Sequence, residues 1–195
     1  MHLAQNRTQA YAYLCAHTQS EHLRQHALSV EAAMRAMARH FAEDEEVWGI
    51  LGLLHDIDYE QYPDEHLQHT EELLRPLGWD QTCIRAILSH GYGLCNEIEP
   101  ISNLEKSLYT VDELTGLITA CVLVRPSRSI LDLEVKSVKK KWKAKGFAAG
   151  CKREVILDGV SRLGMELDTV IQIVLDGMRE RADVLGLAGE QEAIG

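Results

Sequence analysis

Four side chains in this sequence are strong metal ligands, and three separate segments supply them. They are His26, His55, Asp56 and Asp112. Imidazole together with carboxylate suits Fe, Mn, Zn, Co or Ni better than Ca or Mg. We therefore expect these residues to bind a divalent transition metal.

Each of these ligands falls at an inward or terminal position of a predicted helix. His26 lies beside the apolar stripe of a helix that begins at Ser20, with Leu23, Ala27, Val30, Met34 and Met37 on the stripe. His55 and Asp56 close a helix that begins near Asp44, and adjacent side chains at a helix end can splay toward one point. Asp112 is a charged residue in the middle of an apolar helix that runs from Asn103 to a position before Pro126.

The remaining elements are also predicted to be helical. Apolar residues recur at helical spacing, and no Asn-Gly or Asp-Gly hairpin separates alternating runs. We expect helices at residues 8–17, from Pro63 through Leu73 with His66 and His69 on it, from Asp80 to His90 with Gly91 as the stop signal, at 152–163, and from 168 to about 185.

The length and composition predict one globular all-α domain. The chain has 195 residues, and 46% of them are hydrophobic. We expect residues 1–195 to form a single domain, with a helical core at about 20–125 and a basic segment and C-terminal helices at about 126–186. The longest apolar run, at 117–124, is too short to cross a membrane, and the first residues do not resemble a signal peptide, so we expect a cytoplasmic protein. A homo-oligomer remains open.

Charge is distributed unevenly along the chain. The formal net charge of −10 disfavours a nucleic acid polymer as partner. Residues 125–153 nevertheless contain ten basic and two acidic residues, a local charge of +8. This stretch is either a solvated helix face or a cationic path for a small anionic substrate, for which the candidate ligands are Lys139, Lys140, Lys143 and Arg153.

The ordered ligands resemble a known family. His26, then LGLLHDID with His55 and Asp56, then VDELTGL with Asp112 are similar to the H…HD…D signature of the HD superfamily. The resemblance implies an all-α, single-domain helical bundle of the HD-domain type with additional C-terminal helices. It also implies a divalent metal bound by these four residues, used most often to hydrolyse a phosphomonoester or phosphodiester.

The same resemblance implies a second metal. Many superfamily members have two further histidines between the HD pair and the last aspartate, and His66 and His90 occupy matching places, with Asp56 then bridging both metals. His69 is left as a supporting donor or a solvent-facing residue.

The implied reaction is hydrolysis of a small phosphorylated substrate. A metal-activated water would attack phosphorus, with Asp58 or Glu60 orienting that water or carrying its proton. One or two metals per chain are expected. The alternatives are a di-iron oxygenase that uses the same ligands and a non-catalytic binding or signalling module of the same fold.

Overall fold

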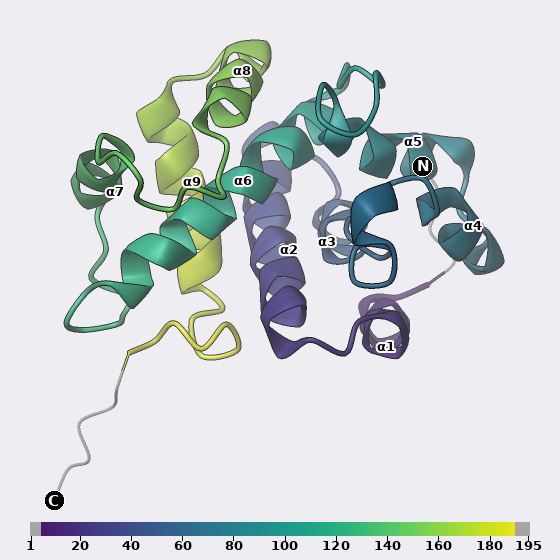
Figure 1. Cartoon of the computed structure of the whole chain (residues 1–195), viewed down its shortest axis with the longest axis horizontal. Coiled ribbons are helices and arrows are strands. Elements are labelled where there is room, and N and C mark those ends of the chain that lie inside the picture. The colour runs from purple at the N-terminus through teal and green to yellow at the C-terminus, as the bar shows by residue number, and fades with distance from the viewer. Residues whose placement is uncertain (1–4, 190–195) are drawn as a thin grey trace, which may run out of the picture.

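The structure is a computed structural model that describes residues 5–189, and these residues form an all-α fold without β-strands (Figure 1). Its helices are α1 (Arg7–His17), α2 (Glu21–Phe41), α3 (Glu45–Leu53), α4 (Thr70–Leu74), α5 (Gln81–Leu88), α6 (Asn103–Leu123), α7 (Val135–Trp142), α8 (Arg153–Leu163) and α9 (Leu167–Arg179). Short 3-10 turns lie at Pro63–Glu65, Arg75–Leu77 and Ser89–Gly91. No helix in the described part of the chain is long and apolar enough to span a membrane.

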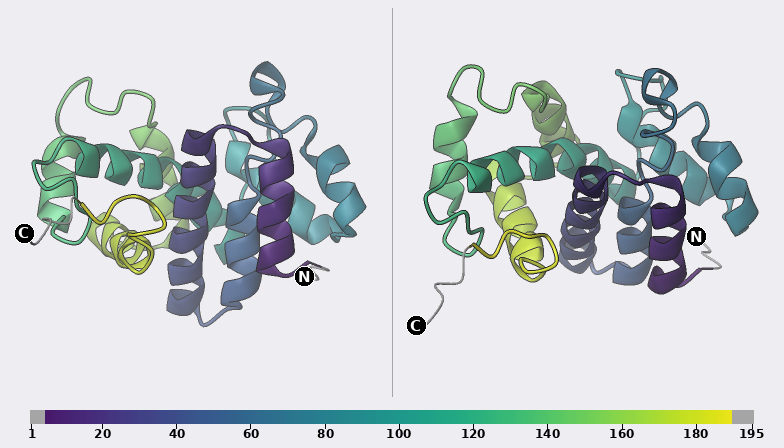
Figure 2. Two further views of the ribbon diagram at one scale, coloured as in Figure 1. Left: turned by 90° about the horizontal axis from the view of Figure 1, so that it is seen from below. Right: turned by 60° about the horizontal axis from the view of Figure 1, so that its bottom comes forward.

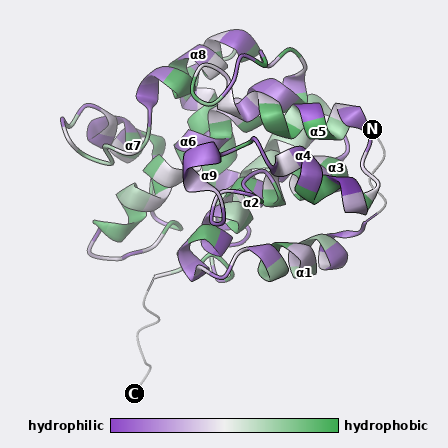
Figure 3. Ribbon diagram, turned by 45° about the vertical axis from the view of Figure 1, so that its right-hand side comes forward, coloured by the Kyte–Doolittle hydropathy of each residue, from purple (hydrophilic) through white to green (hydrophobic). Residues whose placement is uncertain are grey.

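Helix α2 is the centre of the packing. It contacts α3 on one side and α9 on the other, and α6 crosses it. Figure 2 shows α1, α3 and α2 side by side, with α3 in the middle. Most helices carry both hydrophilic and hydrophobic residues, as the colours of Figure 3 show, and the apolar faces pack into one core.

Two glycines allow the close helix contacts around α2. A Cβ atom on Gly52 of α3 would lie 2.9 Å from Cγ of Met34, and one on Gly177 of α9 would lie 2.6 Å from the carbonyl oxygen of Ala32. Any larger residue would push these helices apart. The backbone of α2 is therefore held tightly between α3 and α9.

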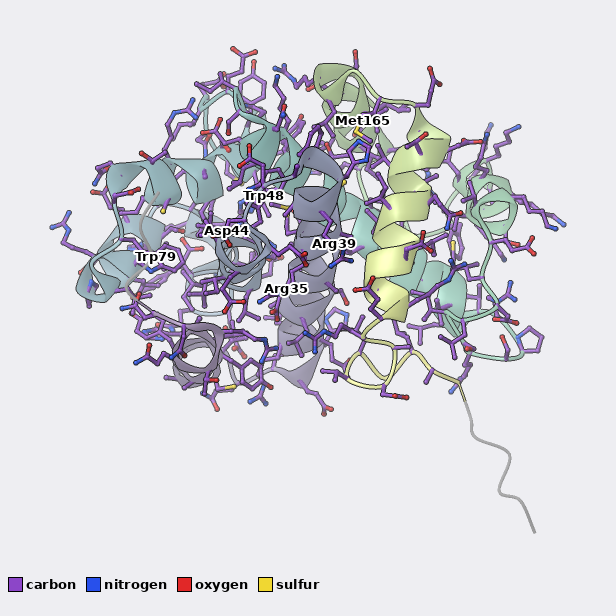
Figure 4. The ribbon with its side chains drawn as sticks, turned by 180° about the vertical axis from the view of Figure 1, so that it is seen from behind. Arg35, Arg39, Asp44, Trp48, Trp79 and Met165 are labelled. Atoms are coloured by element: carbon purple, nitrogen blue, oxygen red, sulfur yellow. The ribbon has the colours of Figure 1, made fainter. Side chains whose placement is uncertain are left out.

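Two arginines of α2 add ion pairs to its contacts with α3 and with the end of α9. Figure 4 shows Arg35 and Arg39 on α2, with Trp48 of α3 nearby. Arg35 pairs with Glu46 at 2.9 Å, and Arg39 pairs with Glu180, just after α9, at 2.8 Å. These pairs are partly exposed, so each adds little stability compared with the core.

Most predicted helix boundaries agree with the structure, because capping side chains fix them. Ser20, Asp44 and Asp80 each accept hydrogen bonds from backbone N–H groups at the start of α2, α3 and α5. The last helix ends earlier than predicted, at Arg179 rather than near residue 185, and turns follow it.

The predicted helix from Pro63 through Leu73 is wrong. A 3-10 turn at Pro63–Glu65 is followed by irregular backbone, and α4 begins only at Thr70. Leu67 has a φ of 70°, in the left-handed region that interrupts a helix. Its buried side chain packs against Gly91, where a Cβ atom would lie only 2.2 Å from Cδ1 of Leu67. Gly91 is thus required for this contact.

The start of α6 depends on a buried carboxylate. Glu105 is 3% exposed and accepts hydrogen bonds from the backbone N–H groups of Ile101 and Ser102 at 2.7 and 2.8 Å, and from the guanidinium of Arg85. Burial raises the pKa of Glu105, but these donors outweigh burial and hold the pKa below its usual value.

We predict that Glu105→Gln lowers the free energy of unfolding by about 1–3 kcal/mol near pH 7, because charged hydrogen bonds at a buried site are lost. A depressed folded-state pKa stabilises the fold above about pH 4.5 and ceases to do so as the pH falls through the folded-state value. Urea unfolding measured from pH 7 to pH 3 should therefore show that the free energies of unfolding of the wild type and of Glu105→Gln become equal in acid. Glu72→Gln, at an exposed position of α4, should change little, and equal losses for both variants would contradict this role.

Candidate metal centre

The fold brings the six predicted ligands to one place from five segments of the chain. His26 lies in α2 and Asp112 in α6, while His55 and Asp56 follow α3 directly. The helix ends at Leu53, with Leu54 as its C-cap, and tight turns continue from there, so His55 and Asp56 are released from helical geometry. His66 lies in the irregular segment before α4, and His90 lies in the 3-10 turn after α5.

One group of donors joins α2, the end of α3 and α6. Nε2 of His26 lies 2.9 Å from Oδ1 of Asp112 and 3.8 Å from Oδ2 of Asp56. Nε2 of His55 lies 3.4 Å from the same Asp112 oxygen. Adjacent ligands bound about 2.1 Å from one metal lie about 3 Å apart, so these spacings fit a transition-metal site.

A second group of donors surrounds the other side of Asp56. Its Oδ1 atom lies 3.3 Å from Nε2 of His66 and 3.4 Å from Nε2 of His90. The same oxygen lies 3.3 Å from Nε2 of His55. Asp56 therefore stands between the two groups: its Oδ2 atom faces His26, and its Oδ1 atom faces His66 and His90 as well as His55.

The hydrogen bonds of the histidine rings leave their inner nitrogens free for a cation. Nδ1 of His55 donates to the Gly52 carbonyl at 2.8 Å, and Nδ1 of His90 donates to the Ile87 carbonyl at 2.7 Å. Nδ1 of His66 donates to Oδ1 of Asp58 at 2.9 Å. A neutral ring with Nδ1 protonated presents a lone pair at Nε2, which is the arrangement of metal-binding histidines.

Two features of these inner nitrogens show that the site fits a cation. Nε2 of His66 and Nε2 of His90 face one another at 3.3 Å, so two lone pairs would meet there in the neutral rings. Nε2 of His55 is fully buried and has no hydrogen-bond partner. A buried polar atom without a partner is costly, and a bound metal would remove that cost.

The charges of the centre support the same conclusion. Burial alone would raise the pKa of Asp56, but His55 and His90 outweigh it and hold this pKa well below the usual range. Asp112 behaves likewise beside His26 and His55. Burial would lower the pKa of His55, yet the two carboxylates raise it well above the usual value. Two buried carboxylates thus require positive charge beside them, which protons or metal ions can supply.

The donors form the floor of an open cavity of about 480 Å³. His26, Asp56, His66, His90 and Asp112 all line it, whereas His55 is completely buried beneath. The walls come from α2, α6, the segment before α8, and the turns around Tyr59 and Leu94. A small substrate can therefore reach the metal-binding atoms from solvent.

The structure gives Asp58 and Glu60 positions away from the cavity. Asp58 is completely buried, and its carboxylate accepts hydrogen bonds from Nδ1 of His66 and, at 3.3 Å, from the backbone N–H of His69. It is placed to orient His66. Glu60 accepts a hydrogen bond from the backbone N–H of Ser20 at 3.0 Å and so ties the turn after α3 to the start of α2. Neither residue lines the cavity, so their expected role with the attacking water has no direct contact to support it.

The four cationic candidates for substrate binding do not line the cavity either. Val138 is buried where α7 packs against α6 and α9, and this turns the lysines outward. Lys139 pairs with Asp168 at 2.7 Å, whereas Lys140 and Lys143 are exposed. The guanidinium of Arg153 donates to backbone carbonyls, including that of Trp142 at 3.0 Å, and holds the loop between α7 and α8.

Two cavity residues were missed in the sequence. Lys152 lines the cavity directly before α8, and its backbone N–H donates to Oε2 of Glu113 at 2.9 Å. Glu113, the neighbour of Asp112, also lines the cavity. Lys152 belongs to the basic stretch at 125–153, and the sequence does not distinguish it from the lysines that point outward. The packing of α8 against α6 brings Lys152 to the cavity.

Comparison with known families agrees with this geometry. The HD domain model matches residues 23–117, a segment that contains all six residues predicted as ligands, and places the chain in the HD superfamily. HD domains bind divalent metals and are generally metal-dependent phosphohydrolases. No curated protein and no solved structure matches the chain.

We predict that the protein, purified without metal-chelating resin, contains divalent transition metal, and that His55→Gln and Asp56→Asn each lower its content. His55 is the buried donor and Asp56 is shared by both groups, so either loss should reduce the metal per chain by at least half. Elemental analysis measures this directly. His40→Gln, at an exposed position of α2, is the control. Full metal occupancy in both variants would contradict the assignment of a metal centre to these residues.

We also predict that Asp58→Asn weakens the site at His66 and His90, by about 10- to 100-fold in metal affinity, because a residue that orients a ligand acts through that ligand. Metal titration of the chelator-treated protein would measure the metal affinity of the weaker of the two sites. Glu60→Gln is the matched control: it should lower the melting temperature but leave both affinities unchanged. An unaltered affinity in Asp58→Asn would make Asp58 a purely structural residue.

Proposed function

We propose that this protein hydrolyses a small phosphate ester, monoester or diester, with two divalent metals bound by His26, His55, Asp56, His66, His90 and Asp112. The observation that carries the proposal is the position of Asp56 between two donor groups on the floor of an open cavity. When bound, such metals activate a water molecule as the nucleophile and neutralise charge on the phosphoryl oxygens.

The charge of the cavity supports an anionic substrate. Two divalent metals would exceed the charge of Asp56 and Asp112, so the loaded floor would be positive. Lys152 adds a cation to the wall, next to the carboxylate of Glu113, with which it interacts electrostatically. A phosphate group on the floor can thus be held from the side by Lys152.

The residues of the chain contribute by holding the donor atoms in fixed positions around the substrate. His55 and His90 are fixed by backbone carbonyls, and His66 is fixed by Asp58, so the donors are oriented before the substrate arrives. The protein's own contribution is therefore a rigid, preorganised floor. Lys152 is the group on the wall that can orient the phosphate.

The direct test is an assay of metal-loaded protein against a panel of phosphomonoesters and phosphodiesters, with and without oxygen. Phosphate or alcohol release that needs metal but not oxygen is expected. The di-iron oxygenase of the same superfamily uses the same ligands and is the alternative. Turnover that requires oxygen and reduced iron would replace the hydrolase, and the absence of turnover in a fully metal-loaded protein would leave a binding or signalling module.

Lys152→Met should lower kcat/KM for phosphate esters about 10- to 100-fold, because the variant keeps the side-chain length but removes a charged contact to phosphate. Metal content should be unchanged. Lys140→Met, on the outer face of α7, should retain wild-type kcat/KM. Steady-state kinetics and elemental analysis on the same preparations measure both quantities. If Lys152→Met and Lys140→Met lower kcat/KM equally, the lysines attract the substrate at long range and Lys152 does not contact the phosphate.

A further inference from the structure

A second cavity adjoins the metal cavity and is not used by the proposed chemistry. Its volume is about 250 Å³, and it shares His22, His26 and Gly116 with the first. The two spaces therefore meet beside His26, a predicted metal ligand. We call the second space the α2–α6 groove.

Helical periodicity explains why the groove begins at the metal centre. On α6, Gly116, Ala120 and Leu123 follow Asp112 at helical spacing. They therefore lie on the same face of the helix as Asp112, over a length of about 16 Å. On α2, Gln25 and Ser29 flank His26 in the same way. The helix faces that supply the metal ligands thus continue as the walls of the groove.

Beyond the histidines the groove is mostly apolar, with Gln25, Ser29 and Thr119 as its uncharged polar lining residues. Gly116 and Ala120 leave space because their side chains are small, and Leu123, Leu185 and Leu187 surround the far end. None of its described lining residues is Asp, Glu, Lys or Arg. The hydroxyl of Ser29 donates to the Gln25 carbonyl at 2.9 Å, so it offers no unmet donor to a ligand.

These walls can bind hydrocarbon but not a second charged group. Leu123 is 54% exposed at the far end, so an elongated ligand could bury part of it. The cationic Lys152 lines the metal cavity and not the groove. The chemistry therefore changes from anion-binding in the metal cavity to mostly apolar in the adjoining groove.

We propose that the α2–α6 groove binds the aliphatic chain of an amphipathic phosphate ester whose phosphate lies at the metal centre. This inference rests on the proposed function, and it names the substrate class. In the reaction the oxygen of water forms a bond to phosphorus, the phosphorus–oxygen ester bond breaks, and the released alkoxide takes a proton to leave as an aliphatic alcohol. The alcohol chain would remain in the groove until release.

Binding of non-hydrolysable alkylphosphonates, from methyl to octyl, tests the groove without turnover. Calorimetry on metal-loaded protein should show affinity rising about two- to fourfold per methylene until the groove is filled. Ala120→Phe fills the groove and should remove this dependence while leaving methylphosphonate affinity unchanged. Ala12→Phe, at an exposed position of α1, is the matched control and should behave as the wild type.

Leu123→Asp provides a second variant at an exposed position, so its folding does not depend on core packing. It should weaken only the longer phosphonates. Affinity independent of chain length in the wild type, or a uniform loss for all lengths in Ala120→Phe, would overturn the groove. Hydrolysis of short esters would then still support the proposed function. Conversely, length-dependent binding without hydrolysis of the matching alkyl phosphates would retain the groove and reject the hydrolase.

Discussion

The rest of the site depends on two partly buried carboxylates, Asp56 and Asp112, held ionised among histidines. Ionised carboxylates away from water require nearby positive charge, because desolvation would otherwise drive them to neutrality. The inner nitrogens of His26, His55 and His90 supply a place for that charge. Protons can supply this charge, but the geometry suits metal ions, because the fixed rings of His55 and His90 direct their Nε2 atoms inward.

The helix packing makes this arrangement rigid. Helix α2 cannot shift easily, because Gly52 and Gly177 let α3 and α9 approach its backbone closely. Helix α6 is anchored at its start by Glu105 and crosses α2 near the ligands. The positions of His26 and Asp112 are therefore set by the core itself, and the non-helical segments add His55, Asp56, His66 and His90.

The C-terminal helices extend the site beyond the metal ligands. Helix α8 packs along α6 and brings Lys152 to the cavity wall, while α9 supports α2 from behind. The segment after α9 returns to the groove through Leu185 and Leu187. The matched segment at 23–117 thus provides the metal floor, and residues outside it shape the space where a substrate would lie.

The sequence by itself determined the all-α fold and most helix starts, because apolar periodicity and capping residues are local signals. The resemblance of its ordered motifs to the HD superfamily predicted which residues converge. The tertiary structure decided which charges face the cavity. Lys139 and Lys152 belong to one basic stretch, yet packing of α7 and α8 turns the first outward and the second inward. It also broke the predicted helix at Leu67, whose burial against Gly91 outweighed local helix propensity, and it gave Asp58 and Glu60 structural hydrogen bonds. Such outcomes depend on contacts between segments far apart in the chain, which no local pattern encodes.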